Sequence, residues 1–272
     1  MRLLLISPLR RRPKRPTRTA FIVLASLLVL GGCSARKAPP SASSAGDLIV
    51  LGRENMQEQD FERARAAFNR ILQEYPESNL RSVALISLAD SFYASKEYEE
   101  AKFQYEKFVQ LYPVNPQTPR AFYFLAMSDY NRLASVARDQ TQAQNALENF
   151  RRLVRQFPDN PLSAEAAPKV TALETRLARK ELMVARFHYS NSNYQSAIPR
   201  FLGLLKEYPK APAVAAALYY LADSYRREEN FRKAGGALRR LIRYHPKSRY
   251  HKKARSLLGK LPKFAQSASK TR

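Results

Sequence analysis

The chain has 272 residues, with 47 Lys and Arg against 23 Asp and Glu, so its formal net charge is +24. It contains a single cysteine, which excludes an intramolecular disulfide and a cysteine-based metal cage. Its three histidines lack the spacing of a zinc-binding helix, and the sequence has no nucleophile elbow or phosphate-binding loop. We therefore expect a protein that is not an enzyme and that holds no metal or cofactor.

Residues 1–32 are predicted to form a signal peptide. Several Arg and Lys residues precede a short apolar run over Phe21–Leu30, and no acidic residue occurs before Asp47. The run is too short for a permanent membrane-spanning helix, so it favours secretion. It ends in Leu-Gly-Gly-Cys33, which resembles the bacterial lipobox. That resemblance implies acylation of Cys33; the alternative is an ordinary buried cysteine.

Residues 33–46 are predicted to be a lipidated cysteine followed by a flexible tether. The segment is rich in Ser, Ala and Pro and has too little apolar surface to offset the entropy lost on folding. Ser34, rather than Asp, follows the cysteine. In bacteria with two membranes this resembles a signal for the outer membrane. We therefore expect a lipid-anchored protein on the periplasmic face of that membrane.

A repeated spacing predicts the fold of residues 47–261. Five times an alanine is followed twelve residues later by a proline that cannot continue a helix. This pattern resembles the second half of the tetratricopeptide repeat, a two-helix unit of about 34 residues. We expect an all-α solenoid of about five such units, a fold suited to binding other molecules. The alanines are Ala64, Ala101, Ala146, Ala197 and Ala234, and the prolines are Pro76, Pro113, Pro158, Pro209 and Pro246.

Two of the units depart from the regular pattern. The third is predicted to contain an insertion around Ser135–Thr141, between its two helices. The fourth is predicted to begin with a long helix from about Ala164 to Tyr189, with Pro168 near its first turn. Because such a helix joins two parts of an array, we expect a front half over residues 47–160 and a distinct back half over 161–261.

The positive charge is concentrated at the carboxyl end. Residues 226–272 contain 16 Lys and Arg but only two acidic residues, and residues 262–272 are predicted to be a disordered basic tail. Nucleic acid is not expected as a partner of an exported protein. The candidates are anionic lipid or lipopolysaccharide head groups and an acidic face of another protein. A solvated end without a specific partner is the alternative.

The first helices of the front units are predicted to line a groove. In tetratricopeptide geometry these helices face the concave side, where aromatic and Met side chains offer adaptable contacts and Arg53 offers a bidentate site for a carboxylate. An extended peptide ending in an aromatic residue and a free carboxylate would fit such a lining. Ordinary packing between helices is the alternative. The expected lining is Ile49, Arg53, Met56, Ile86, Asp90, Tyr93, Tyr123, Met127 and Tyr130.

Together these features resemble one family. The lipobox, the tether, the five repeats, the Arg-Asp-Gln-Thr insertion at 138–141 and the segment 176–189 are similar to the BamD family of outer-membrane β-barrel assembly lipoproteins. The likeness covers about residues 47–250 and does not extend to the basic tail. It implies a scaffold that docks the barrel-inserting subunit through its back half and has other assembly lipoproteins as further partners. It also implies that the front half receives the C-termini of unfolded outer-membrane proteins.

Arg200, beside Phe201 in the fourth unit, is the residue that we expect to contact the barrel-inserting subunit; a solvated arginine is the alternative. Two other functions remain open from the sequence. One is an adaptor lipoprotein that recruits peptidoglycan enzymes or pilus components to the outer membrane. The other is a module that binds a lipid surface through its basic end.

Overall fold

The computed structural model describes residues 44–266. The predicted signal peptide, Cys33, most of the tether and residues 267–272 lie outside this range. Within it every regular element is a helix, and none of these helices is long and apolar enough to cross a membrane. In chain order the helices are α1 (Ala45–Gln57), α2 (Phe61–Glu74), α3 (Arg81–Ala94), α4 (Tyr98–Leu111), α5 (Thr118–Tyr130), α6 (Thr141–Gln156), α7 (Pro161–Ser190), α8 (Tyr194–Glu207), α9 (Val214–Arg227), α10 (Phe231–Tyr244), α11 (His251–Gly259) and α12 (Lys263–Gln266).

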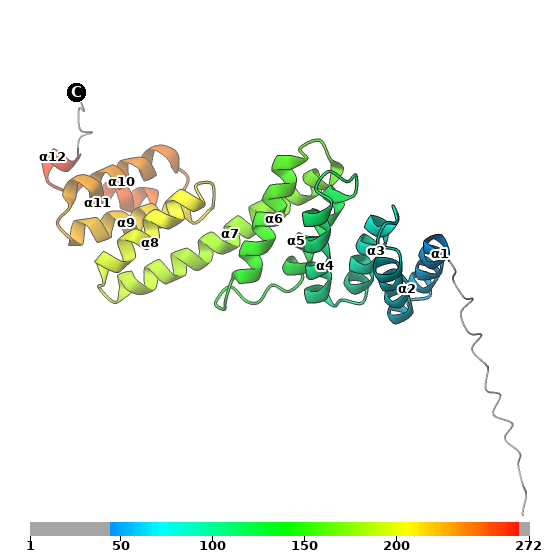
Figure 1. The fold of residues 1–272 in the computed structure, drawn as a ribbon. Coiled ribbons are helices and arrows are strands. Elements are labelled where there is room, and N and C mark those ends of the chain that lie inside the picture. Colours follow the sequence, from blue (N-terminus) through cyan, green and yellow to red (C-terminus); the bar gives the residue numbers. More distant parts are fainter. Residues whose placement is uncertain (1–43, 267–272) are drawn as a thin grey trace, which may run out of the picture. The chain divides into compact units, whose positions relative to one another are not determined.

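The helices form five helix-turn-helix units, which confirms the predicted all-α repeat fold. Each helix from α1 to α10 packs against the next one along the chain, and α12 packs against α10 (Figure 1). All five repeat alanines are completely buried. Each repeat proline directly follows the residue that caps the second helix of its unit, as Pro76 follows Tyr75. The spacing in the sequence therefore marks where the helices touch and where they end.

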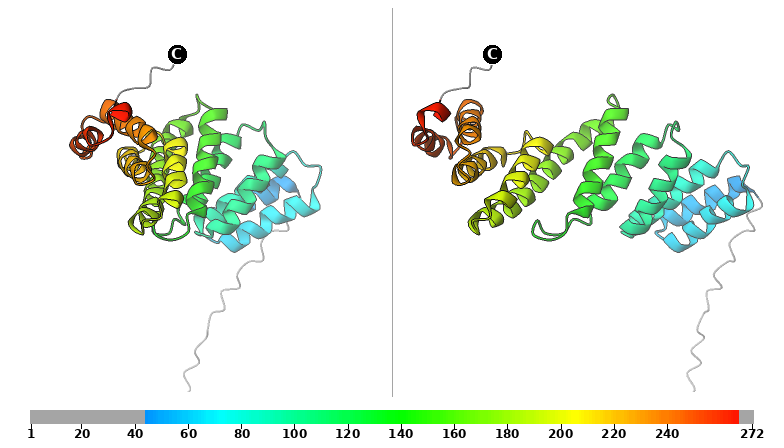
Figure 2. Two further views of the ribbon diagram at one scale, coloured as in Figure 1. Left: turned by 90° about the vertical axis from the view of Figure 1, so that its left-hand side faces the viewer. Right: turned by 60° about the vertical axis from the view of Figure 1, so that its left-hand side comes forward.

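The buried side chains group into three cores. The first lies between α1, α2 and α3, the second extends from α3 to α7, and the third extends from α7 to α12. The long helix α7, seen in the middle of the array in Figure 2, contributes Leu173 and Leu177 to the second core and Ala178 and Ala185 to the third. Tyr208, at the end of α8, packs against both of these cores.

Local chemistry places the starts of two helices differently from the sequence prediction. The first helix begins at Ala45, before residue 47, because Ser44 and Asp47 form a capping box. The long helix begins at Pro161, since the side chain of Asn160 accepts a hydrogen bond from the backbone N–H of Leu162. Pro168 consequently lies inside α7.

The folded part of the chain also extends past 261, where the basic tail was expected to begin. Helix α12 covers residues 263–266, and Ala265 in it is buried. The guanidinium of Arg239 donates a 2.7 Å hydrogen bond to the carbonyl oxygen of Ala265. A side chain at Gly235 would collide with that same oxygen, so the glycine allows α12 to approach α10.

The insertion of the third unit is attached to α7. It occupies the connection 131–140, whereas the other four units turn within three residues. The buried amide of Gln140 donates to backbone carbonyls of the connection, among them that of Ser135 at 2.9 Å. Arg176 and Lys180 of α7 donate to the carbonyl oxygens of Ala134 and Ala137. These contacts fix the connection against the long helix.

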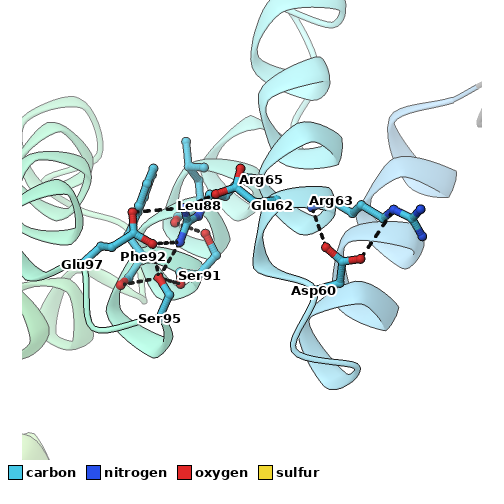
Figure 3. Close-up of polar contacts among 9 residues, drawn as sticks. All are labelled: Asp60, Glu62, Arg63, Arg65, Leu88, Ser91, Phe92, Ser95 and Glu97. Carbon is cyan, nitrogen blue, oxygen red and sulfur yellow. Dashed lines mark hydrogen bonds and ion pairs between the residues drawn. The ribbon is translucent and has the colours of Figure 1, made fainter. Parts of the chain in front are cut away.

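A buried arginine joins the first unit to the second. Arg65 of α2 donates to both carboxylate oxygens of Glu97, at 2.6 and 3.2 Å, and to the hydroxyl of Ser95 (Figure 3). Its guanidinium also lies 4.0 Å above the ring centre of Phe92. The hydrogen bonds from Arg65 and Ser95 hold the pKa of Glu97 below its usual value. The cluster fixes α2 against the turn between α3 and α4.

Replacing Arg65 by methionine should lower the free energy of unfolding by about 1–3 kcal/mol, since hydrogen bonds to a charged group are lost while the packing volume is kept. Arg63, on the same helix, is a matched control for the loss of an arginine (Figure 3). It is half-exposed, and its ion pair with Asp60 is long, at 3.5 Å. Arg63→Met should change stability by less than about 0.5 kcal/mol. Urea unfolding would measure the free energy of unfolding of both variants. An equal loss of stability in the two would contradict the role given to Arg65.

Candidate peptide-binding groove

A cavity of about 650 Å³ opens between the first helices of the three front units. Helices α1 and α3 and the start of α5 with the segment before it supply most of its lining, and Phe68 of α2 and Phe108 of α4 supply the rest. Its lining combines apolar and polar side chains, as binding sites do when apolar contact is joined by a few polar groups that fix orientation. The lining comprises Arg53, Met56, Gln57, Phe68, Ser82, Val83, Ile86, Ser87, Asp90, Phe108, Asn115, Gln117 and Arg120.

The charges of the cavity leave one arginine available. Asp90 is paired with Arg120 at 2.9 Å and accepts a 2.6 Å hydrogen bond from the hydroxyl of Tyr105. Burial, together with this neighbouring carboxylate, raises the pKa of Tyr105 far above its ordinary value, so the phenol stays protonated and donates. Arg53 is exposed and has no ion pair within residues 44–266. The free charge facing the cavity is therefore positive.

Four of the nine residues expected in the groove line this cavity, namely Arg53, Met56, Ile86 and Asp90. Ile49 is buried in the first core instead. The other four belong to the second core, where they are partly buried: Tyr93, Tyr123, Met127 and Tyr130.

The three tyrosines do not line the cavity, because their rings pack against other aromatic rings. The ring of Tyr93 lies 4.9 Å from that of Phe124, and its hydroxyl accepts a 2.9 Å hydrogen bond from the amide of Asn131. Tyr123 and Tyr130 both contact the buried ring of Phe150. The structure therefore does not bring Tyr93 and Arg53 together as one site.

The sequence interpretation missed the wall made by Asn115, Gln117 and Arg120. Arg120 lies three residues before Tyr123 and seven before Met127, so the helical period could have placed it on the same stripe. Gln117 and Asn115 precede α5, where no helical period applies. Only the packing of the third unit on the second brings them to the cavity.

The back half carries a second and smaller cavity, of about 510 Å³. It lies on α7 and is bordered by the cations Arg179 and Arg186 and by Tyr220 of α9. Met183 and Phe187 are unusually exposed for large apolar side chains, at 43% and 64%. This face offers apolar contact next to positive charge.

Arg200 lies on α8, outside both cavities. Its side chain is 54% exposed, and its guanidinium is 3.7 Å from a carboxylate oxygen of Glu181 on α7. Such a long and exposed pair contributes little to stability, so the guanidinium can change partners at small cost. Across residues 44–266, no group of three or more His, Cys, Asp and Glu side chains is placed to hold a metal ion.

The chain resembles known proteins in its sequence and is matched by two family models. The model of the YfiO family, described as an outer membrane lipoprotein, matches residues 42–229, and a tetratricopeptide repeat model matches 216–248. The chain is 28% identical over 203 residues to outer membrane protein assembly factor BamD of Rickettsia prowazekii, covering 73% of this chain and 79% of that protein. It is 24% identical over 216 residues to the BamD of Haemophilus influenzae, covering 76% and 82%. Among solved structures, MamA is 16% identical with a TM-score of 0.38, covering 74% of this chain and 95% of MamA.

Proposed function

The chain belongs to the YfiO family of outer membrane lipoproteins, and on this premise we propose that it is a scaffold of outer-membrane protein assembly that binds other protein chains without chemical catalysis. The observation that carries the proposal is the family match, because it covers the front cavity, the insertion and α7 in one continuous stretch. The relatives are themselves named assembly factors. The adaptor for peptidoglycan enzymes or pilus components has no comparable support.

In this proposal the front cavity receives the C-terminus of an unfolded outer-membrane protein. Arg53 would bind the terminal carboxylate, since it is the exposed arginine at the cavity without an ion pair among the described residues. Met56 and Ile86 would contact the last apolar side chain. Arg120 is held by Asp90 and would shape the wall rather than bind the ligand.

The back half would dock the barrel-inserting subunit, of the BamA kind, and other lipoproteins of the assembly machinery. The exposed guanidinium of Arg200 supports this assignment, because its present partner Glu181 holds it only loosely. An acyl chain on Cys33 would hold the scaffold at the periplasmic face of the outer membrane, next to these partners.

Isolation of the tagged protein from membranes in a mild detergent tests the proposal. A scaffold of this kind should bring with it a β-barrel protein that carries periplasmic repeats. Isolation of peptidoglycan enzymes or pilus proteins instead, with no β-barrel protein, would contradict it.

Arg200→Glu should lower recovery of the barrel-inserting subunit by about tenfold, because a favourable contact at the interface becomes a repulsive one. The measurement is quantitative immunoblotting after isolation, with circular dichroism to show that the helices are intact. Arg155→Glu is the matched control, since Arg155 is also an exposed arginine on a second helix, paired with Glu148 at 3.3 Å. The Arg155→Glu protein should recover as much of the barrel-inserting subunit as the wild type does.

A second variant separates docking from internal pairing. Arg200→Glu combined with Glu181→Arg restores an ion pair between α7 and α8. If recovery stays low in the double variant, Arg200 acts on the partner. If it returns to the wild-type level, Arg200 serves only to join the two helices, and the docking role is wrong.

A further inference from the structure

The last three helices that the structure describes, α10 to α12, carry no acidic residue. After Glu229 the sequence contains no Asp or Glu at all. Between there and the end of α12 it has twelve Lys and Arg, eleven of which have exposed positions. They are Arg232, Lys233, Arg240, Arg243, Lys247, Arg249, Lys252, Lys253, Arg255, Lys260 and Lys263. A solvated surface normally mixes both signs of charge, so this one is unusual.

The cations of helix α10 lie on one face of that helix. At 3.6 residues per turn, its five cations fall within an arc of about 120°. The buried residues Ala234, Leu238 and Leu241 are on the opposite side, against the third core. The exposed cations Arg232, Lys233, Arg240 and Arg243 therefore point away from the third core, while Arg239 at the edge of this face contacts α12.

Helices α11 and α12 continue the positive surface and hold it in place. Only Ala254 of α11 is fully buried, while its cations are exposed. The contact of Arg239 with Ala265 fixes α12 on α10. Two large rings are exposed among the cations, Tyr244 at 64% and Phe264 at 59%. Aromatic side chains with this exposure favour the boundary between lipid head groups and acyl chains.

We propose that the exposed basic face of α10, α11 and α12 binds the anionic phospholipid head groups of the membrane to which the lipoprotein is attached. The family places the chain at a membrane, where phosphate groups are present at high density. A diffuse cluster of cations without matching acids suits a surface of many phosphates better than a single defined protein partner. This inference goes beyond the scaffold function and does not require it.

The test uses residues 41–272, which contain all three cores and lack the acylation site. Co-sedimentation with vesicles of roughly 30% phosphatidylglycerol in phosphatidylcholine should show binding in about 0.1 M salt that is lost in about 0.5 M salt. Vesicles of phosphatidylcholine alone should bind weakly. Each cation near an anionic membrane strengthens binding by roughly fivefold, so the triple variant Arg232→Gln, Arg240→Gln, Arg243→Gln should bind about a hundredfold more weakly.

A second triple variant, which removes three positive charges outside α10, α11 and α12, is the matched control. Lys107, Arg155 and Lys206 are exposed on the second helices α4, α6 and α8, and their replacement by Gln should weaken vesicle binding by less than about fivefold. Equal losses in the two triple variants, or equal binding to both kinds of vesicle, would overturn the proposal. The proposal would also be overturned if the wild-type protein bound neither kind of vesicle and the α10 triple variant lost binding to an acidic protein partner. These outcomes are independent of whether the barrel-inserting subunit is isolated.

Discussion

Arg53→Ala should weaken the binding of a peptide that ends in Phe with a free carboxylate by about tenfold to hundredfold. The reason is the charge distribution in the front cavity, where Arg120 is already paired with Asp90 and Arg53 is not paired within the described residues. Fluorescence titration with a labelled peptide measures the affinity. The same peptide with an amidated C-terminus should bind the wild type more weakly, and Arg53→Ala should add little to that loss.

Two controls sharpen this experiment. Arg70→Ala removes an arginine on α2 that is paired with Glu74 at 2.9 Å and does not line the cavity, so peptide affinity should not change. Arg53→Lys keeps the charge but loses bidentate geometry, and it should fall between the wild type and Arg53→Ala. A wild-type protein that binds the acid and the amide equally would remove the carboxylate role.

Cys33→Ser should release the protein from membranes that have been washed with alkaline carbonate. An acyl chain contributes roughly 0.8 kcal/mol per buried CH₂, so losing the acyl chains should reduce partitioning by roughly ten-thousandfold or more. The wash strips proteins held by partners or by the basic end, and it leaves lipid-anchored ones in place. Fractionation and immunoblotting measure the distribution, and accumulation of the larger precursor would show that processing also fails.

The control for this experiment is Ser34→Ala, since it leaves the cysteine and the Leu-Gly-Gly sequence before it unchanged. The Ser34→Ala protein should remain with the washed membranes. If the Cys33→Ser protein remains with the washed membranes to the same extent, acylation of Cys33 is not the anchor.

The fold could be predicted from the sequence because its signals are local. Each repeat alanine lies at a close approach of two helices, and each proline ends a helix, so a twelve-residue spacing carries both pieces of information. The insertion in the third unit was visible for the same reason, since it breaks that register. The folding of residues 263–266 was not visible, because it depends on α12 packing against Gly235, far from it in sequence.

The candidate site was only partly predictable. Repeat geometry identified the helices that face the cavity, and the positions Arg53, Ile86 and Asp90 on them lie where expected. It could not show that the expected tyrosines pack sideways against the second core, because they lie on the same stripes of the helices as residues that line the cavity. The choice is made by neighbouring rings, as Phe124 shows for Tyr93. Such contacts between units have no signature in a single sequence.

The position of α7 in two cores has a consequence for communication along the molecule. Contacts in a repeat array join neighbours, so a change at the front cavity can influence α10 only through the elements in between. Within the part of the chain that the structure describes, only α7 and Tyr208 belong to both the second and the third core. Strain imposed on the front units by a bound chain would therefore reach the back half through α7, where Leu177 of the second core adjoins Ala178 of the third, or through Tyr208.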